Sequence, residues 1–425
     1  MNYSQATEYI FSFSSLKARP SLDRIKELMR LSGEPQNSFK SVHVAGTNGK
    51  GSVSTYISSV LTESGYRTGL YTSPHVVSFR ERIRVDGEMI SESDVARITE
   101  GLVPLVESMT EKPTVFDLIT AVSFIYFKER SCDFAVLECG LGGKFDSTNI
   151  VSPELSVLCS ISLDHLGVLG SDISEITAEK CGIIKPGTPA VSYPFRFSAD
   201  VFNPQRRESA EIISKTAEEK NSRLTVADPD LITLAHSDEN GTEITVGGLT
   251  LKTRLAGVHQ KANILTAYTA LSELSEKFGI TDKSIISGFL KADIPARLEK
   301  VHDGPTVIVD GGHNADCAKA LRLFIENNIF TEKPTAVIAM MRDKQCDKVL
   351  EETAELFENI IVTQVSSERA CGADELAEKA RLFNRAVVSE KDVRTALKKA
   401  VDLKKPVFVF GSFYLAGEAK EYFSH

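Results

Sequence analysis

Residues 42–52 read Val-His-Val-Ala-Gly-Thr-Asn-Gly-Lys-Gly-Ser, an apolar run that ends in glycines, a lysine and a serine. Apolar residues then recur at helical spacing as far as Gly65, which predicts a strand, a glycine-rich turn and a helix in that order. In such a turn the backbone N–H groups point inward, and the positive end of the helix dipole faces an anion. Lys50 can reach outer phosphates, and Thr47 or Ser52 can offer a hydroxyl to phosphate or Mg²⁺.

This stretch departs from the common phosphate-loop pattern G-x-x-x-x-G-K-[ST]. Gly51 separates Lys50 from Ser52, and the first glycine is Gly46 rather than residue 44. A glycine-rich turn with a surface lysine is the alternative interpretation. The predicted strand and helix on its two sides favour a phosphate loop instead, and we expect its nucleotide contacts to come from Thr47, Asn48, Gly49, Lys50, Gly51 and Ser52.

Polar side chains also follow three further predicted strands: Ser73 after 68–72, Glu138 after 133–137 and His165 shortly after 155–161. Ligands of open parallel sheets bind at the carboxyl ends of the strands, so these side chains are expected to meet near the phosphate loop. Mg²⁺ prefers oxygen ligands, which makes Glu138 and Ser73 candidate ligands. Histidine is a less usual Mg²⁺ ligand, and His165 taken alone is more often structural. Lys180, on a predicted helix over 173–181, is by default a solvated cation.

Residues 79–85 alternate apolar and charged side chains, with arginines at 80, 82 and 84. This alternation favours a solvated edge strand. Binding of a substrate carboxylate by one of the arginines is the other interpretation, because guanidinium groups pair with carboxylates.

The remaining pattern predicts an α/β protein of two domains. Residues 188–255 hold short alternating runs around Gly247-Gly248, a hairpin signal. After Pro295-Ala296-Arg297, strands predicted at 306–310, 335–340, 359–365 and 406–410 alternate with helices. We therefore expect a parallel-sheet phosphate-loop domain over residues 1–296 and a smaller, Rossmann-like α/β domain over residues 297–425.

Composition excludes several classes of protein. The 425 residues are 42% hydrophobic and 25% charged, with a net charge of −9 and no basic block, which argues against sequence-independent nucleic-acid binding. No apolar run is long enough to cross a membrane, and the first ten residues lack the basic segment of a signal peptide. Seven cysteines without a C-x-x-C pair indicate a reducing compartment rather than a disulfide framework or a zinc site. We expect a cytoplasmic protein without nucleic-acid or membrane partners.

Across nearly its whole length, the chain resembles the folylpolyglutamate synthase/dihydrofolate synthase group of the Mur ligase superfamily. Motifs from both predicted domains carry the resemblance jointly. They are HVAGTNGKGS at 43–52, YTSPH at 71–75, ECGLGG at 138–143, DSTN at 146–149, LDH at 163–165, LG at 169–170, EKCGIIK at 179–185, PARLE at 295–299, DGGHN at 310–314 and GSFYL at 411–415.

The resemblance implies roles for residues at matching positions. Ser73 and Glu138 would bind one Mg²⁺ and His165 would lie near a second, while Lys180 would be carbamylated by CO₂ and become an anionic oxygen ligand. The implied ATP contacts from the domain interface are Asn263, Arg297, Asp310 and His313, and the implied pterin loop includes Thr114, Phe116, Asp146 and Ser147. Lys50, Lys180 and His165 are the implied catalytic residues.

The implied activity is ATP-dependent ligation of L-glutamate to a pteroate-type or folate-type carboxylate. Attack of that carboxylate on the γ-phosphate would give an acyl phosphate and ADP, and the amine of glutamate would then displace phosphate. The expected cofactors are ATP and Mg²⁺ at two sites. The expected partners are these small molecules, and we expect a monomer whose second domain closes over ATP and binds glutamate.

Two alternatives have different sequence requirements. A cell-wall Mur ligase carries a UDP-binding domain before its phosphate loop, whereas only about forty residues precede it here, too few for a Rossmann-type unit. A nucleotide-dependent switch or scaffold ATPase is the alternative from another class. The second α/β unit with Asp310 and His313 argues against it, and glutamate-dependent ADP release would separate the two functions.

Overall fold

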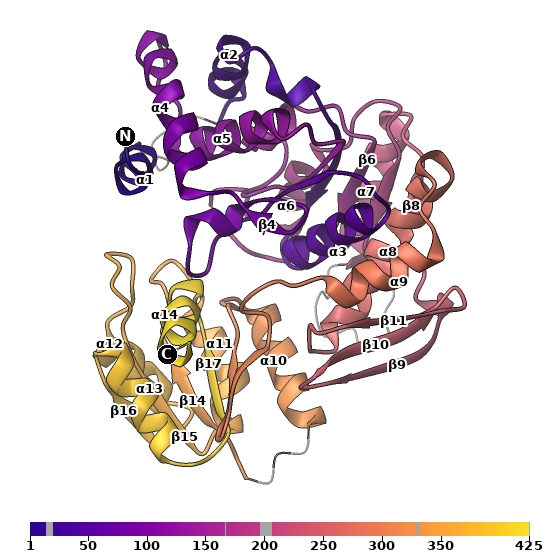
Figure 1. The fold of residues 1–425 in the computed structure, drawn as a ribbon. Helices are drawn as coiled ribbons and strands as arrows, with labels where there is room; N and C mark the ends of the chain where they lie inside the picture. The colour runs from indigo at the N-terminus through magenta and orange to yellow at the C-terminus, as the bar shows by residue number, and fades with distance from the viewer. Residues whose placement is uncertain (14–19, 166, 196–205, 329, 331, 425) are drawn as a thin grey trace.

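The computed structural model describes residues 1–13, 20–165, 167–195, 206–328, 330 and 332–424. Two α/β regions with a small antiparallel sheet make up the molecule, and Figure 1 shows the second region, in orange and yellow, below the first. Three sheets have the strand orders β4-β3-β2-β5-β1-β6-β7-β8, β11-β10-β9 and β12-β13-β17-β14-β15-β16. The α/β prediction is confirmed.

The first sheet is centred on β1, which pairs in parallel with β5 and β6. Its strands are β1 Lys40–Ala45, β2 Thr68–Tyr71, β3 Ile83–Val85, β4 Glu88–Met89, β5 Phe134–Glu138, β6 Leu155–Leu158, β7 Ala190–Ser192 and β8 Leu224–Val226. Alternate residues of β5 enter separate cores on the two faces, Phe134 and Val136 on one and Ala135 and Leu137 on the other. A strand buried on both faces explains the unbroken apolar run in its sequence.

Helices cover both faces of this sheet. They are α1 Tyr3–Phe11, α2 Asp23–Leu31, α3 Lys50–Glu63, α4 Glu92–Ser108, α5 Val115–Glu129, α6 Ile173–Cys181, α7 Arg206–Glu219, α8 His259–Phe278 and α9 Asp282–Lys291. Helix α3 packs with α8 and α9 over one face, whereas α4 and α5 contribute to the core of the other. No helix in the described part of the chain is long and apolar enough to span a membrane.

The predicted hairpin around Gly247-Gly248 is confirmed. Strands β10 Gly241–Val246 and β11 Leu249–Thr253 pair antiparallel, and β9 Ile232–Asp238 pairs with the other side of β10. Both turn glycines have positive φ, 57° and 83°, which residues with a Cβ rarely adopt.

The second region contains a sheet that is parallel apart from its first strand. The strands are β12 Glu299–Asp303, β13 Thr306–Val309, β14 Thr335–Ile338, β15 Asn359–Val362, β16 Val387–Ser389 and β17 Val407–Phe410. Its helices are α10 Ala315–Asn327, α11 Cys346–Thr353, α12 Ala373–Arg381, α13 Val393–Asp402 and α14 Phe413–Phe423. The predicted boundary between residues 296 and 297 falls between α9 and β12 and stays a prediction.

The interpretation of residues 79–85 as a solvated edge strand is wrong. Phe79–Arg82 forms a 3₁₀ turn with a capping box between Ser78 and Glu81, and only Ile83–Val85 is a strand, with β4 outside it. Arg80 and Arg82 are engaged rather than solvated, since Arg80 Nε donates to the carbonyl of Ile90 at 2.6 Å and Arg82 Nε donates to His75 Nδ1 at 2.7 Å. Alternation of apolar and charged side chains favours a strand, but the capping box formed by a serine and a glutamate three residues later stabilises a 3₁₀ turn here.

Candidate active site

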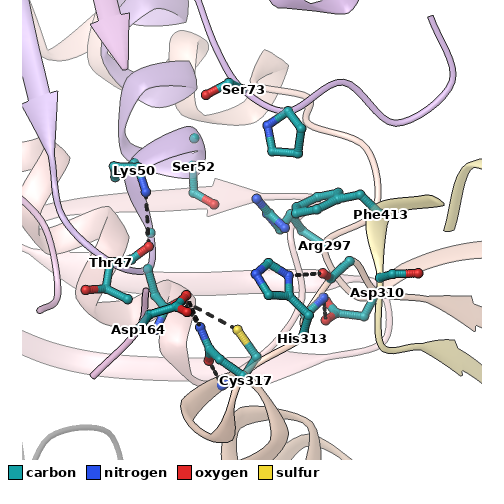
Figure 2. A pocket seen from close by; sticks show the side chains of 18 of the residues that line it. Thr47, Lys50, Ser52, Ser73, Asp164, Arg297, Asp310, His313, Cys317 and Phe413 are labelled. Carbon is teal, nitrogen blue, oxygen red and sulfur yellow. Dashed lines mark hydrogen bonds between the residues drawn. The ribbon is translucent and has the colours of Figure 1, made fainter. Parts of the chain in front are cut away.

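A cavity of about 510 Å³ lies where the carboxyl ends of the two main sheets face each other. The phosphate loop, Ser73, Glu138 and His165 line it from the first domain, and Arg297, Asp310 and His313 line it from the second. Figure 2 shows Lys50 and Thr47 on one side of this space and Arg297 and His313 on the other. The structure therefore brings together most of the side chains selected at predicted strand ends and in the second domain.

The phosphate loop has the predicted strand–turn–helix form, with α3 beginning at Lys50. Gly49 has φ 86°, a left-handed conformation that favours glycine, and a Cβ there would lie 2.4 Å from Asn263 Oδ1 unless that side chain moved. The backbone N–H groups of Thr47 and Asn48 donate to the Ser160 carbonyl, which fastens the loop to the chain after β6. Lys50 Nζ donates to the Thr47 carbonyl at 3.1 Å and lines the cavity, so it is within the loop rather than a free surface lysine.

Glu138 ends β5 and is almost completely buried beside the cavity. Its Oε2 accepts the Ser73 N–H at 3.0 Å, the one hydrogen bond that its side chain makes with the described residues. Burial raises the pKa of the carboxyl, and the charges of Lys50 and Arg297 oppose that rise. Glu138 thus retains acceptor capacity that a hard cation could use.

Ser73 lies in a loop of residues 73–78, which is held in place by side chains of the 3₁₀ turn that follows it. Arg82 Nε donates to His75 Nδ1 at 2.7 Å, and both side chains line the cavity. Burial, and then the charge of Arg82, lowers the pKa of His75 to about 4, so the imidazole is neutral and can accept this hydrogen bond. Arg82 is therefore a partly buried cation that lines the cavity, and binding of a substrate carboxylate by one of these arginines stays a prediction.

Lys180 is not a solvated cation. It is 4% exposed, and its Nζ donates to the Gly46 carbonyl at 2.8 Å, directly behind the phosphate loop. Burial, and next the charge of Lys50, lowers its pKa to about 7. A substantial fraction of the amine is consequently neutral near pH 7, the protonation state that can react with CO₂.

His165 lies in the loop after β6, with φ 54° and a side chain that is 41% exposed. Its neighbour Asp164 makes a partly buried ion pair with Lys344 of the second domain, Nζ to Oδ1 at 3.0 Å. Asn314 Nδ2 also crosses the interface, to Asn48 Oδ1 at 3.0 Å. The two domains are thus joined by polar contacts at the edge of the cavity.

Three residues of the second domain are positioned by backbone groups and an aromatic ring. Asp310 accepts the N–H groups of Leu298 at 3.0 Å and Gly312 at 2.7 Å. His313 Nδ1 lies 3.0 Å from the Gly311 carbonyl, and burial lowers its pKa to about 4. The Arg297 guanidinium lies 4.7 Å from the centre of the Phe413 ring, a cation–π contact that holds it toward the cavity, as Figure 2 shows.

Asn263 is buried on α8 and lines the cavity beside Gly49. Its Nδ2 donates to Gln260 Oε1 at 3.1 Å. Helix α8 begins at His259, whose side chain also lines the cavity.

The four residues of the implied pterin loop occupy different surroundings. Phe116 lines the cavity and packs so closely on Gly140 that a Cβ there would lie 2.1 Å from its ring. Thr114 caps α5, and Ser147 Oγ donates to Asp117 Oδ1 at 2.6 Å. Asp146 accepts backbone N–H groups within its own loop. Phe116 therefore borders the cavity, and the other three make local contacts that shape its wall.

Several residues that line the cavity were not selected from the sequence as site residues: His75, Asp164, His259, Cys317, Lys344 and Phe413. Asp164 and Phe413 lie inside motifs that carry the resemblance, so the motifs themselves were the available signal. Within the described residues, no cluster of three or more His, Cys, Asp or Glu side chains could hold a metal ion. A cation here would need hydroxyl, carboxylate and non-protein oxygens together.

Residues 44–271 match the Mur ligase middle domain, and residues 296–413 match the glutamate ligase domain of Mur ligases. The fold and the site therefore define a Mur ligase. The chain is 31% identical to the dihydrofolate synthase/folylpolyglutamate synthase of Bacillus subtilis, over 99% of this chain and 98% of that protein. It belongs to the folylpolyglutamate synthase/dihydrofolate synthase family, as the motifs predicted.

Solved structures agree with this assignment. Mycobacterium tuberculosis folylpolyglutamate synthase complexed with ADP has a TM-score of 0.90 at 28% identity, covering 100% of this chain and 98% of that one. An FPGS–AMPPCP–folate complex has a TM-score of 0.83 at 29% identity, covering 99% of both chains.

Proposed function

We propose that this protein is an ATP-dependent ligase that adds L-glutamate to a folate-type carboxylate through an acyl phosphate, with release of ADP and phosphate. The observation that carries the proposal is the cavity in which the phosphate loop faces Arg297, Asp310 and His313 of the second domain. Relatives over the full length are named folylpolyglutamate and dihydrofolate synthases, and related structures hold ADP or AMPPCP and folate.

The first step transfers the γ-phosphoryl group of ATP to the substrate carboxylate. Two anions must approach each other, so catalysis depends on positioning and on cations that neutralise charge. Lys50 supplies one cation from the phosphate loop and Arg297 another from the second domain. Arg82 is a third, placed to bind a substrate carboxylate.

We assign the Mg²⁺ ligands to Ser73 Oγ and Glu138, with His165 near a second ion. Support comes from the free acceptor capacity of Glu138 and from its contact with the Ser73 backbone. Bound Mg²⁺ would neutralise phosphate charge.

We assign Lys180 as the residue carbamylated in the active enzyme. Its neutral Nζ attacks CO₂, an N–C bond forms, a proton leaves the nitrogen, and the product carries an anionic carboxylate. The lowered pKa and the position of Nζ behind the phosphate loop support this assignment. The new oxygens would add to the few protein oxygens on the metal side.

The second step is attack of the glutamate amine on the acyl phosphate. Water would hydrolyse that intermediate, so closure of the second domain over the cavity would protect it. The polar contacts of Asn314 with Asn48 and of Lys344 with Asp164 already link the two domains beside the cavity. The pterin portion of the acceptor is assigned to the wall formed by Phe116 and the loop around Thr114, Asp146 and Ser147. A monomer in the cytoplasm remains our expectation, and seven free thiols fit a reducing compartment.

A substrate panel tests the proposal against the switch-protein alternative. Purified protein is supplied with ATP, Mg²⁺, labelled glutamate and either dihydropteroate or tetrahydrofolate. We expect glutamate-dependent ADP release and a labelled amide with at least one acceptor. ADP release that ignores glutamate with every pterin acid would overturn the proposal.

A further inference from the structure

The loop of residues 73–78 carries Ser73 into the cavity but contains no regular secondary structure of its own. A loop that positions a proposed metal ligand must be held in place, because a displacement of about 1 Å can cost catalysis about 100-fold. Among the described residues, three side chains of the first domain outside the loop form hydrogen bonds with it. Glu138 accepts the Ser73 N–H, Arg82 donates to His75, and Glu81 binds the rest.

Glu81 makes the largest share of these contacts. Its Oε2 accepts the N–H of Val76 at 2.7 Å, and its Oε1 accepts those of Val77 at 2.9 Å and Ser78 at 2.8 Å. The side chain is only 9% exposed. Three charge-assisted hydrogen bonds, donated by backbone N–H groups to one buried carboxylate, fix the second half of the loop.

The other side of the loop touches the second domain. The side chain of Val76 packs against the core that α14 helps to form. Gly417, in the middle of α14, lies so close that a Cβ there would be 2.3 Å from the Val76 carbonyl oxygen. Helix α14 is on the side of the second domain that faces the first (Figure 1).

This contact, rather than the backbone conformation, explains why residue 417 is a glycine. Glycine inside a helix lowers stability relative to alanine, and its backbone here is helical, so conformation does not require it. The contact with a backbone oxygen does require it, because a main-chain atom cannot rotate away as the end of a side chain can.

We propose that Glu81 and Gly417 are positioning residues, which hold loop 73–78 between the domains and so set the place of Ser73 when the second domain is docked. Glu81 fixes the loop from the first domain, and Gly417 permits α14 to press on it from the second. The role in turnover rests on the proposed function, whereas the effect on loop order is independent of it.

The chain offers a matched control for each residue. Gly101 is also inside a helix, α4, but a Cβ there would meet nothing within 4 Å. Glu63 is a partly buried carboxylate of the same domain that accepts from Ser287 and Lys291, away from the loop. We compare Gly417→Ala with Gly101→Ala, and Glu81→Gln with Glu63→Gln.

Hydrogen exchange of peptides spanning residues 73–82 is measured without substrate, and glutamate ligation is measured against Mg²⁺ concentration. In Glu81→Gln and Gly417→Ala, we expect exchange faster by about tenfold, turnover lower by about 100-fold and a higher Mg²⁺ concentration for half-maximal activity. Both controls should keep wild-type exchange, turnover and Mg²⁺ response.

Unchanged exchange in the loop, in either variant that folds, would overturn the positioning role whatever the activity. Lost turnover with an unchanged Mg²⁺ response and intact exchange would also contradict it. If Gly417→Ala fails to fold, Glu81→Gln decides the matter by the same readouts. If wild-type protein ligates no glutamate, the proposed function fails, while the exchange comparison still tests the coupling.

Discussion

Glu138, the last residue of β5, and Asp146, in the loop that follows, are both buried carboxylates, yet their surroundings differ. The two oxygens of Asp146 accept from Gly140 N, Leu141 N and the N–H and hydroxyl of Thr148. Glu138 accepts only from Ser73 N within the described residues and faces the cavity. Burial raises the pKa of both, so the pKa does not separate their roles. The hydrogen bonds do separate their roles. The oxygens of Asp146 are occupied by donors of its own loop and hold that loop in place, whereas Glu138 keeps acceptor capacity with which it can bind a ligand.

The largest effect is expected at Glu138. Glu138→Ala should lower Mg²⁺-dependent ligation by about 1,000-fold, since it removes a group aimed at the reacting charges. The fold should persist, because the side chain supports only one backbone N–H. Glutamate ligation and circular dichroism of the purified variant check this, and turnover close to wild type would refute the metal assignment.

Lys50 acts on Glu138, because its positive charge opposes the rise that burial causes in the pKa of this carboxyl. Lys50→Ala should reduce ATP-dependent turnover by about 100-fold or more. Lys50→Arg should also be poor, because a planar guanidinium does not replace a compact ammonium. Nucleotide affinity and rate are measured together, and normal values in both variants would place the phosphate site elsewhere.

Lys180 tests whether the site beside Glu138 needs a further anion. Lys180→Ala should lower turnover by about 100-fold, and a short carboxylic acid added to that variant should restore part of it. Bicarbonate should activate the wild type alone. A metal-bound, fully active crystal with an unmodified Lys180 ammonium would contradict carbamylation.

The lowered pKa of Lys180 also predicts how stability depends on pH. Its folded pKa is about 7 against an ordinary value of 10.5, so between these values the unfolded chain binds more protons. The contribution of Lys180 to stability therefore rises as pH increases from about 7 toward 10.5. Urea unfolding at several pH values, compared with Lys180→Met, checks the sign. An identical pH dependence in the variant would exclude a lowered pKa.

The smallest effect on turnover is expected at Asp146. Asp146→Asn leaves N–H donors facing an amide and should cost about 1–3 kcal/mol of stability. Turnover of the folded variant should stay close to wild type, because the side chain bonds its own loop. Thermal unfolding and ligation rates measured together check this. A normal melting temperature with lost pterin-acid affinity would make Asp146 a direct ligand.

The sequence predicted Glu138 and Ser73 correctly as cavity residues because both follow apolar parallel strands, whose carboxyl ends must meet. It could not predict the surroundings of Lys180 or Asp164. Lys180 contacts a carbonyl 134 residues earlier, and Asp164 pairs with Lys344 180 residues later, and no local pattern encodes such distances. Arg82 was misassigned because a capped 3₁₀ turn imitates strand alternation.

Metal binding tests the contrast between the two carboxylates most directly. Binding of Mn²⁺, as a paramagnetic substitute for Mg²⁺, is followed by electron paramagnetic resonance with AMPPCP present, in wild type, Glu138→Ala and Asp146→Asn. We predict that Glu138→Ala loses the protein-dependent site and that Asp146→Asn retains it. Equal Mn²⁺ binding by wild type and Glu138→Ala would contradict the assignment of Glu138 as a metal ligand.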